Sequence, residues 1–220
     1  MIGALVFDFD GLILDTEGPV YTAWAEAFAA HGCGDLTIDE WAHEIGTIGG
    51  LDLIGMMRDR APEPFDEDAM HEQRRVRREE LLAREWTLPG VIDWLDGAAA
   101  RGLGIAIASS SAADWVEPHL ARLGLTARFA HVATGDQVSA PKPAPDVYLA
   151  ACNALAVEPA DAIAIEDSPN GVRAAKAAGL RCIAVPHAIT ALLDLSEADL
   201  VLESLAAVTL DEVLETLKSR

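Results

Sequence analysis

Short, continuously apolar runs recur along this chain, and each is followed by polar or turn-forming residues. A short run without polar alternation is typical of a strand that is buried on both faces of a sheet. The residues that follow each run are then expected at the carboxyl end of a strand. The predicted strands are Ile2–Phe7 before Asp8, Leu103–Ala108 before Ser109, Ala162–Ile165 before Glu166, and Arg181–Val185 before Pro186.

Alanine-rich segments with helical spacing separate the later strands, and several of them end at or near a glycine. A glycine just beyond the last turn is a common helix stop. Alternating strands and helices predict an α/β fold with a doubly wound parallel sheet of the Rossmann-like kind, in which ligands bind beyond the carboxyl ends of the strands. The predicted helices are Val91–Arg101, Ala112–Leu123, Asp146–Leu155 and Asn170–Ala178.

Residues 16–87 have a different pattern, with helical spacing throughout and no predicted strand. Turn-forming residues, Gly18 with Pro19 and Pro89 with Gly90, mark the two joints. We therefore expect a core domain of residues 1–15 and 88–220 and an inserted helical domain of residues 16–87. The helical segments within the insertion are Val20–His31, Asp39–Glu44, Leu51–Arg60 and Asp66–Arg84.

Charge limits the partners of this chain. Its 220 residues include 16 Lys and Arg against 36 Asp and Glu, which gives a formal net charge of −20. The long-range field of such a chain repels nucleic acids and anionic membranes, so neither is an expected partner. A site for a small phosphate would need positive charge supplied locally by a metal ion, a lysine or a helix N-terminus.

The cysteines and the N-terminus bear on the compartment. Cys33, Cys152 and Cys182 form no Cys-x-x-Cys pair, which argues against a disulfide framework and a thiolate zinc site. The first residues lack the basic start of a signal peptide, and no apolar run reaches membrane-spanning length. We expect a soluble, monomeric protein of the reducing cytoplasm.

The first strand end offers a pair of carboxylates. Asp8 and Asp10 are two positions apart, so both can reach one crevice beyond the strand, and Gly11 permits close approach of a ligand. Phosphoryl transfer through a covalent intermediate needs an ionised nucleophile and a proton donor. In so acidic a chain, a solvated turn is the simpler interpretation of the pair taken alone.

The later strand ends offer phosphate donors and a cation. Ser109 lies between a predicted strand and a helix, where its hydroxyl and nearby backbone N–H groups can hold a phosphate oxygen. Helix capping by Ser110 or Ser111 is the simpler alternative. Lys142 lies between prolines, which stiffen its loop. Asp167 also follows a strand, where it could instead cap the next helix.

Taken in order, these motifs closely resemble those of the haloacid dehalogenase superfamily, in its β-phosphoglucomutase-like branch. The resemblance spans nearly the whole chain and implies that the helical insertion is the small cap domain of that branch. The stretches that carry it are Phe7-Asp-Phe-Asp-Gly-Leu-Ile-Leu-Asp-Thr16, Ser109 after its apolar run, Lys142 within Lys-Pro-Ala-Pro-Asp, and Glu166-Asp-Ser-Pro-Asn-Gly171.

The resemblance implies a Mg²⁺-dependent phosphatase that hydrolyses a small phosphorylated metabolite. Asp8 matches the nucleophile that forms an aspartyl-phosphate, and Asp10 matches the general acid and base. An oxygen-rich ligand set is what Mg²⁺ prefers. The matching metal ligands are Asp8, the backbone carbonyl of Asp10, and Asp167 with Glu166 alongside, and the matching phosphate-binding residues are Ser109, Ser110 and Lys142.

Two other functions remain as alternatives. A sugar phosphomutase of the β-phosphoglucomutase type grips a second phosphate with a cap arginine and also carries a histidine shortly after the first motif. Gly49 and Val20 stand at the matching positions here. The arginines of residues 71–84 fit surface pairs such as Arg75 with Glu79, so hydrolysis is favoured. A receiver-type signalling domain needs only about 120 residues and carries its acceptor aspartate on a later strand.

Overall fold

A computed structural model describes residues 2–45 and 52–218 of the chain. The chain forms two compact units. The core unit comprises Met1–Leu14 with Trp86–Arg220, and the helical unit comprises Asp15–Glu85.

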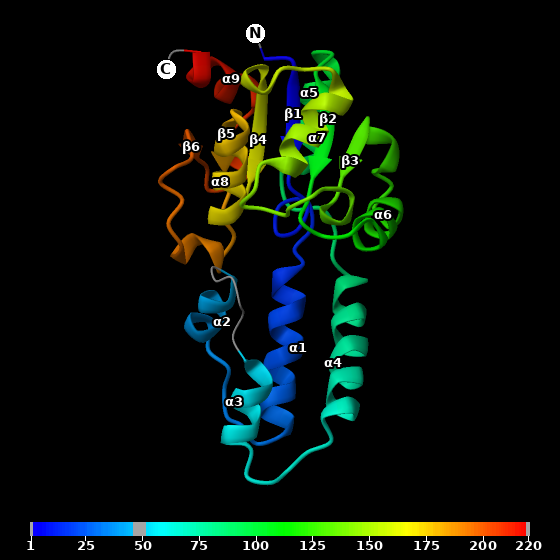
Figure 1. The fold of residues 1–220 in the computed structure, drawn as a ribbon, viewed down its shortest axis with the longest axis vertical. Helices are drawn as coiled ribbons and strands as arrows, with labels where there is room; N and C mark the ends of the chain where they lie inside the picture. The colour runs from blue at the N-terminus through cyan, green and yellow to red at the C-terminus, as the bar shows by residue number, and fades with distance from the viewer. Residues whose placement is uncertain (1, 46–51, 219–220) are drawn as a thin grey trace. The chain divides into compact units, whose positions relative to one another are not determined.

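A parallel sheet of six strands forms the centre of the core unit, in the order β3-β2-β1-β4-β5-β6 (Figure 1). β1 lies between β2 and β4, with Phe7 in register with Ile107 on one side and Ile165 on the other. Strand order reverses about β1, and ligands bind at such a switch point in doubly wound sheets. The strands are β1 Ala4–Phe7, β2 Gly104–Ala108, β3 His131–Ala133, β4 Ala162–Glu166, β5 Arg181–Ala184 and β6 Leu200–Val201.

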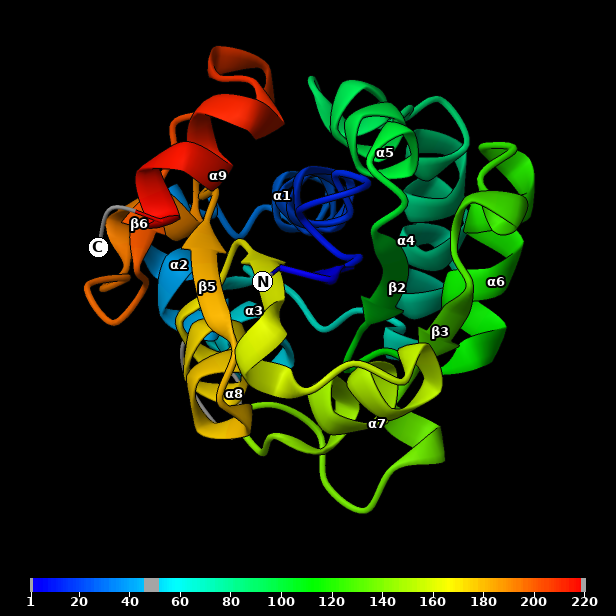
Figure 2. The same cartoon turned by 90° about the horizontal axis from the view of Figure 1, so that it is seen from above.

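Helices cover both faces of this sheet (Figure 2). Leu5 and Phe7 of β1 pack in one buried cluster with Trp94 of α5 and with side chains of α6 and α9. Ala4 and Val6, which point to the opposite face, pack with side chains of α7 and α8. This two-sided burial explains why the strands are apolar without alternation. The helices are α5 Val91–Ala100, α6 Ala113–Arg122, α7 Asp146–Leu155, α8 Pro169–Ala178 and α9 Leu210–Lys218.

The predicted fold class, an α/β protein with a doubly wound parallel sheet, is confirmed. The expected strands are found with ends shifted by one or two residues, but β3 and β6 were not predicted.

The helical unit consists, among its described residues, of helices α1 Glu17–Ala30, α2 Ile38–Ile45, α3 Leu53–Arg60 and α4 Glu67–Leu82. α1 and α4 pack side by side (Figure 1). The placing of Gly18 and Pro19 in a turn was wrong, because both lie in the first turn of α1. Proline is tolerated there, since its missing N–H has no partner within the helix. The Gly18 N–H donates to Asp15 Oδ1 at 2.9 Å.

Ion pairs occupy most of the arginines on α4. Arg75 pairs with Glu72 and Glu79, both at 2.6 Å, which confirms the predicted surface pairing for that residue. Arg77 pairs with Glu26 of α1 at 2.7 Å and with Glu80 at 3.2 Å.

None of the helices in the described part of the chain is both long and apolar enough to cross a membrane.

Candidate active site

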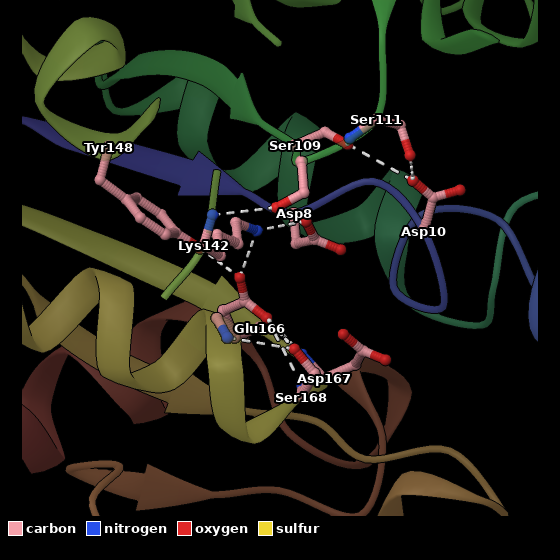
Figure 3. A network of polar contacts seen from close by, with 11 residues as sticks. Asp8, Asp10, Ser109, Ser111, Lys142, Tyr148, Glu166, Asp167 and Ser168 are labelled. Carbon is pink, nitrogen blue, oxygen red and sulfur yellow. Dashed lines mark hydrogen bonds and ion pairs between the residues drawn. The ribbon is translucent and has the colours of Figure 1, made fainter. Parts of the chain in front are cut away.

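Polar side chains of the core unit gather beyond the carboxyl ends of β1, β2 and β4, together with Lys142 from the loop before α7 (Figure 3). The parallel register brings these strand ends to one edge of the sheet. The sequence-predicted residues Asp8, Ser109 and Glu166 therefore belong to one neighbourhood, as their positions after strands predicted.

Lys142 connects two buried carboxylates. Its Nζ donates to Asp8 Oδ1 and, at 2.5 Å, to Glu166 Oε1 (Figure 3). The exposed fractions of the side chains are 6% for Lys142, 8% for Asp8 and zero for Glu166. The backbone N–H of Lys142 donates to Ser110 Oγ at 3.2 Å, so Ser110 contacts the lysine loop through its side chain.

Further donors fix the Glu166 carboxylate. Oε1 also accepts the Tyr148 hydroxyl at 2.6 Å, and Oε2 accepts the backbone N–H groups of Asp167 at 3.1 Å and Ser168 at 3.4 Å. The carboxylate lies so close to the first turn of α8 that a Cβ on Gly171 would be 1.9 Å from the Glu166 Cδ. Glycine at 171 is therefore required for this arrangement.

Among its described residues, the site contains one cationic side chain, Lys142, and several carboxylates, and this imbalance shifts the pKa values of both kinds of group. Burial raises the pKa of Asp8 well above its ordinary value, Lys142 opposes the rise, and Glu166 and Asp167 add to it. Burial by itself lowers the pKa of Lys142, but Asp8 and Glu166 outweigh burial and raise it. The lysine is therefore charged, and the site carries surplus negative charge that a bound cation would relieve.

A divalent cation fits these residues. Oxygen atoms of Asp8, Glu166 and Asp167 all lie within 4.8 Å of one another, and all three side chains are buried. Carboxylate oxygens are the ligands of hard cations such as Mg²⁺. Asp167 Oδ2 also lies 3.2 Å from His187 Nε2, and a Cβ on Gly11 would be 2.5 Å from the same oxygen.

Asp10 faces a different set of donors. Its Oδ2 accepts the hydroxyl of Ser111 at 2.7 Å and that of Ser109 at 3.4 Å (Figure 3). Its Oδ1 accepts the indole N–H of Trp115 at 2.8 Å. The Asp10 side chain is thus outside the set of three carboxylates, so the predicted metal contact of Asp10 concerns only its backbone carbonyl.

The capping alternatives were wrong. The N-cap of α6 is Ala112, which makes no side-chain capping bond, so Ser110 and Ser111 do not cap that helix. The N-cap of α8 is Ser168, whose Oγ accepts the Gly171 N–H at 3.2 Å, so Asp167 is not the cap.

Side chains that contact the predicted residues but were missed in the sequence include, among the described residues, Ser111, Trp115, Tyr148, Ser168 and His187. His187 follows the end of β5, so its place after a predicted strand was a usable signal. Tyr148 and Trp115 lie on helices, where nothing in the sequence pattern distinguishes them from packing aromatics.

The chain matches known proteins over most of its length. The family model for haloacid dehalogenase-like hydrolases matches residues 5–185. A putative phosphatase, YhcW of Bacillus subtilis, is 40% identical over the whole of both chains. The structure of CbbY from Rhodobacter sphaeroides in complex with xylulose-(1,5)bisphosphate is 33% identical with a TM-score of 0.71, and covers 94% of this chain and 96% of its own.

A structure described as a putative β-phosphoglucomutase from Thermotoga maritima is 26% identical, with a TM-score of 0.77 and coverage of 100% of this chain and 99% of its own. The fold and the site thus define an enzyme of the hydrolase class. The chain belongs to the haloacid dehalogenase-like hydrolase family, which confirms the resemblance found in the sequence motifs.

Proposed function

We propose that this protein is a Mg²⁺-dependent phosphatase that hydrolyses a small phosphorylated metabolite through a phosphorylated Asp8. The observation that carries the proposal is the buried Asp8 carboxylate, held by Lys142 and set beside Glu166 and Asp167. A fixed carboxylate next to a cation site is what in-line attack on a phosphate ester needs.

In the first half of the proposed reaction, a carboxylate oxygen of Asp8 forms a bond to phosphorus while the bond from phosphorus to the ester oxygen breaks. Asp10 donates a proton to the departing oxygen, which leaves as an alcohol. In the second half, Asp10 takes a proton from water as the water oxygen attacks phosphorus. The bond between phosphorus and Asp8 breaks, which releases phosphate and restores the carboxylate.

The other residues of the site bind the phosphate and the metal ion and balance their charge. Lys142 reduces the negative charge that an incoming phosphate meets, and Ser109 and Ser110 are proposed to bind phosphate oxygens. Mg²⁺ would be held by Asp8, Asp167 and the backbone carbonyl of Asp10, and when bound it supplies positive charge for the phosphoryl oxygens. Glu166 stays a predicted ligand, although both of its oxygens already accept hydrogen bonds.

Small phosphorylated carbohydrates are the substrates that we propose to test first. The support is the similarity to CbbY, whose structure contains a sugar bisphosphate. The mutase alternative is kept because of the similarity to a putative β-phosphoglucomutase. Of the two positions that favour hydrolysis, Val20 lies on α1 and Gly49 lies outside the described residues.

The helical unit is proposed to act as the cap of this enzyme. Support comes from its place in the chain, directly after the loop that carries Asp8 and Asp10, and from its separate compact packing. We also propose that the protein is a monomer and that it works in a reducing cytoplasm. The reducing compartment is supported by Cys33, Cys152 and Cys182, which are all free and buried.

A screen of phosphorylated metabolites for phosphate release, with Mg²⁺ and with EDTA, tests the proposed function. We expect Mg²⁺-dependent release from at least one sugar phosphate, and no release by the folded Asp8→Asn variant. Asn has nearly the shape of Asp but is a poor nucleophile, so the variant keeps the fold and loses the reaction. Equal release by the wild type and Asp8→Asn would contradict the proposal.

A further inference from the structure

The indole of Trp115 points its N–H at the carboxylate of Asp10. Nε1 of Trp115 lies 2.8 Å from Asp10 Oδ1, while the Ser111 hydroxyl lies 2.7 Å from Asp10 Oδ2. Each oxygen of the carboxylate thus has its own donor. Two directional hydrogen bonds on different oxygens fix the rotation of a carboxylate as well as its position.

The two donors are not equivalent. A serine hydroxyl rotates and can donate or accept, whereas an indole has a single N–H that only donates. Trp115 also belongs to the first turn of α6, next to the fully buried Val116, so its donor is carried by a helix that packs in the core. Trp115 therefore fixes the direction of its own hydrogen bond to the Asp10 carboxylate more firmly than Ser111 can.

The ring of Trp115 is itself held in place. It meets the ring of His119, one turn further along α6, edge to face with centroids 4.7 Å apart. The His119 ring in turn lies 6.2 Å from that of Phe9, which precedes Asp10 in the chain. These contacts connect α6 to the Asp10 loop twice, through the aromatic rings and through the indole N–H.

Another tryptophan of the core unit shows what a purely structural indole does. Trp94 is buried, and its Nε1 donates to the backbone carbonyls of Leu205 at 3.0 Å and Val208 at 3.2 Å. Trp115 is only half-buried, and its N–H is directed to a carboxylate at the candidate active site. The two tryptophans therefore form a matched pair for experiment.

We infer that Trp115 is a positioning residue, whose indole N–H holds the Asp10 carboxylate in the orientation in which it transfers protons. This inference rests on the proposed phosphatase reaction and on the role of Asp10 in it. Trp115 touches no reacting atom in this scheme and acts only through Asp10.

The test compares Trp115→Phe with Trp94→Phe, using Mg²⁺ and a sugar phosphate that the wild type hydrolyses in the screen, because the sugar oxygen that leaves needs the proton that Asp10 donates. Loss of one hydrogen bond to a charged group corresponds to a fall in kcat of between about 10-fold and 100-fold. We expect that fall for Trp115→Phe, with KM within about twofold of the wild type. Trp94→Phe is expected to lower the melting temperature and to leave kcat unchanged. Wild-type kcat in Trp115→Phe, or a raised KM with unchanged kcat, overturns the inference.

A double-mutant cycle separates this inference from the proposed function. If Trp115 acts through Asp10, Trp115→Phe changes kcat by less than about twofold in an Asp10→Ala background. An equally large fall in that background shows that Trp115 acts elsewhere and overturns the inference. Full activity of Asp10→Ala contradicts the proposed function itself, and the inference with it.

A spectroscopic measurement applies even if Trp115→Phe fails to fold. The chain has 5 tryptophans, so its amide correlation spectrum contains few indole N–H signals to assign. We expect Asp10→Ala to shift the Trp115 indole signal and to leave that of Trp94 in place. An unshifted Trp115 signal shows that the contact is absent in solution and overturns the inference.

Discussion

Replacing Lys142 by methionine tests the electrostatics of the site. Methionine keeps most of the side-chain volume but removes the ammonium that contacts both Asp8 and Glu166. Because these carboxylates are almost completely buried, removing their partner is expected to lower the free energy of unfolding by about 3–5 kcal/mol. A buried carboxylate can take up a proton, which limits the loss. The measurement is urea denaturation at pH 8 in EDTA.

The loss should depend on pH with a definite sign. Burial raises the pKa of Asp8 and Lys142 opposes that rise, so removal of the lysine raises the pKa further. A carboxyl whose folded-state pKa lies above its unfolded value of about 3.9 binds more protons when folded, and its effect on stability becomes unfavourable as the pH rises above that value. The deficit of Lys142→Met is therefore expected to be larger at pH 8 than at pH 5.

Lys176→Met is the matched control for this experiment. Lys176 pairs with Asp199 at 2.7 Å, but the two side chains are 33% and 31% exposed. An ion pair that water reaches contributes about 1 kcal/mol or less. The reasoning is refuted if Lys142→Met loses no more stability than Lys176→Met, or if its deficit is the same at both pH values.

Three more outcomes are expected. The Asp167→Ala variant should need far more Mg²⁺ than the wild type for phosphate release. Mg²⁺ should raise the melting temperature of the wild type but not of this variant. Phosphate release by the wild type that survives EDTA would count against the metal site. Tyr148→Phe removes one hydrogen-bond donor to Glu166 and should lower the free energy of unfolding, measured by urea denaturation, by about 1.5–3 kcal/mol. An unchanged midpoint of urea denaturation would show that the Tyr148 hydroxyl contributes nothing to stability. With β-glucose 1-phosphate primed by the 1,6-bisphosphate, Gly49 and Val20 predict phosphate release in preference to glucose 6-phosphate, and faster isomerisation than hydrolysis would favour the mutase.

The strand ends were predictable from the sequence because a strand buried on both faces is an uninterrupted apolar run, which ends where the polar residues begin. Ala4–Phe7 and Ala162–Glu166 consist of apolar residues up to the carboxylates that follow or end them. β3 and β6 were missed because strands of three and two residues are too short to show a pattern. The hydrogen bonds that hold them come from β2 and β5, which are distant in the sequence.

Positions within the site were only partly predictable. Asp8 and Ser109 follow strands, so topology alone predicts that they lie near each other. Lys142 lies in a loop with no periodic pattern, and its place in the site came from the motif resemblance. The contact between Trp115 and Asp10 joins residues 105 positions apart. It depends on how α6 packs, which no local sequence rule describes.

A direct measurement of the central claim is a single turnover of the purified protein with a sugar phosphate that it hydrolyses, quenched in acid and followed by mass spectrometry of its peptides. The proposed mechanism predicts that one phosphoryl group appears transiently on Asp8 before free phosphate accumulates, and that the Asp8→Asn variant shows neither. Release of phosphate in one turnover without any phosphoryl group on Asp8, or release by Asp8→Asn at the wild-type rate, would contradict it.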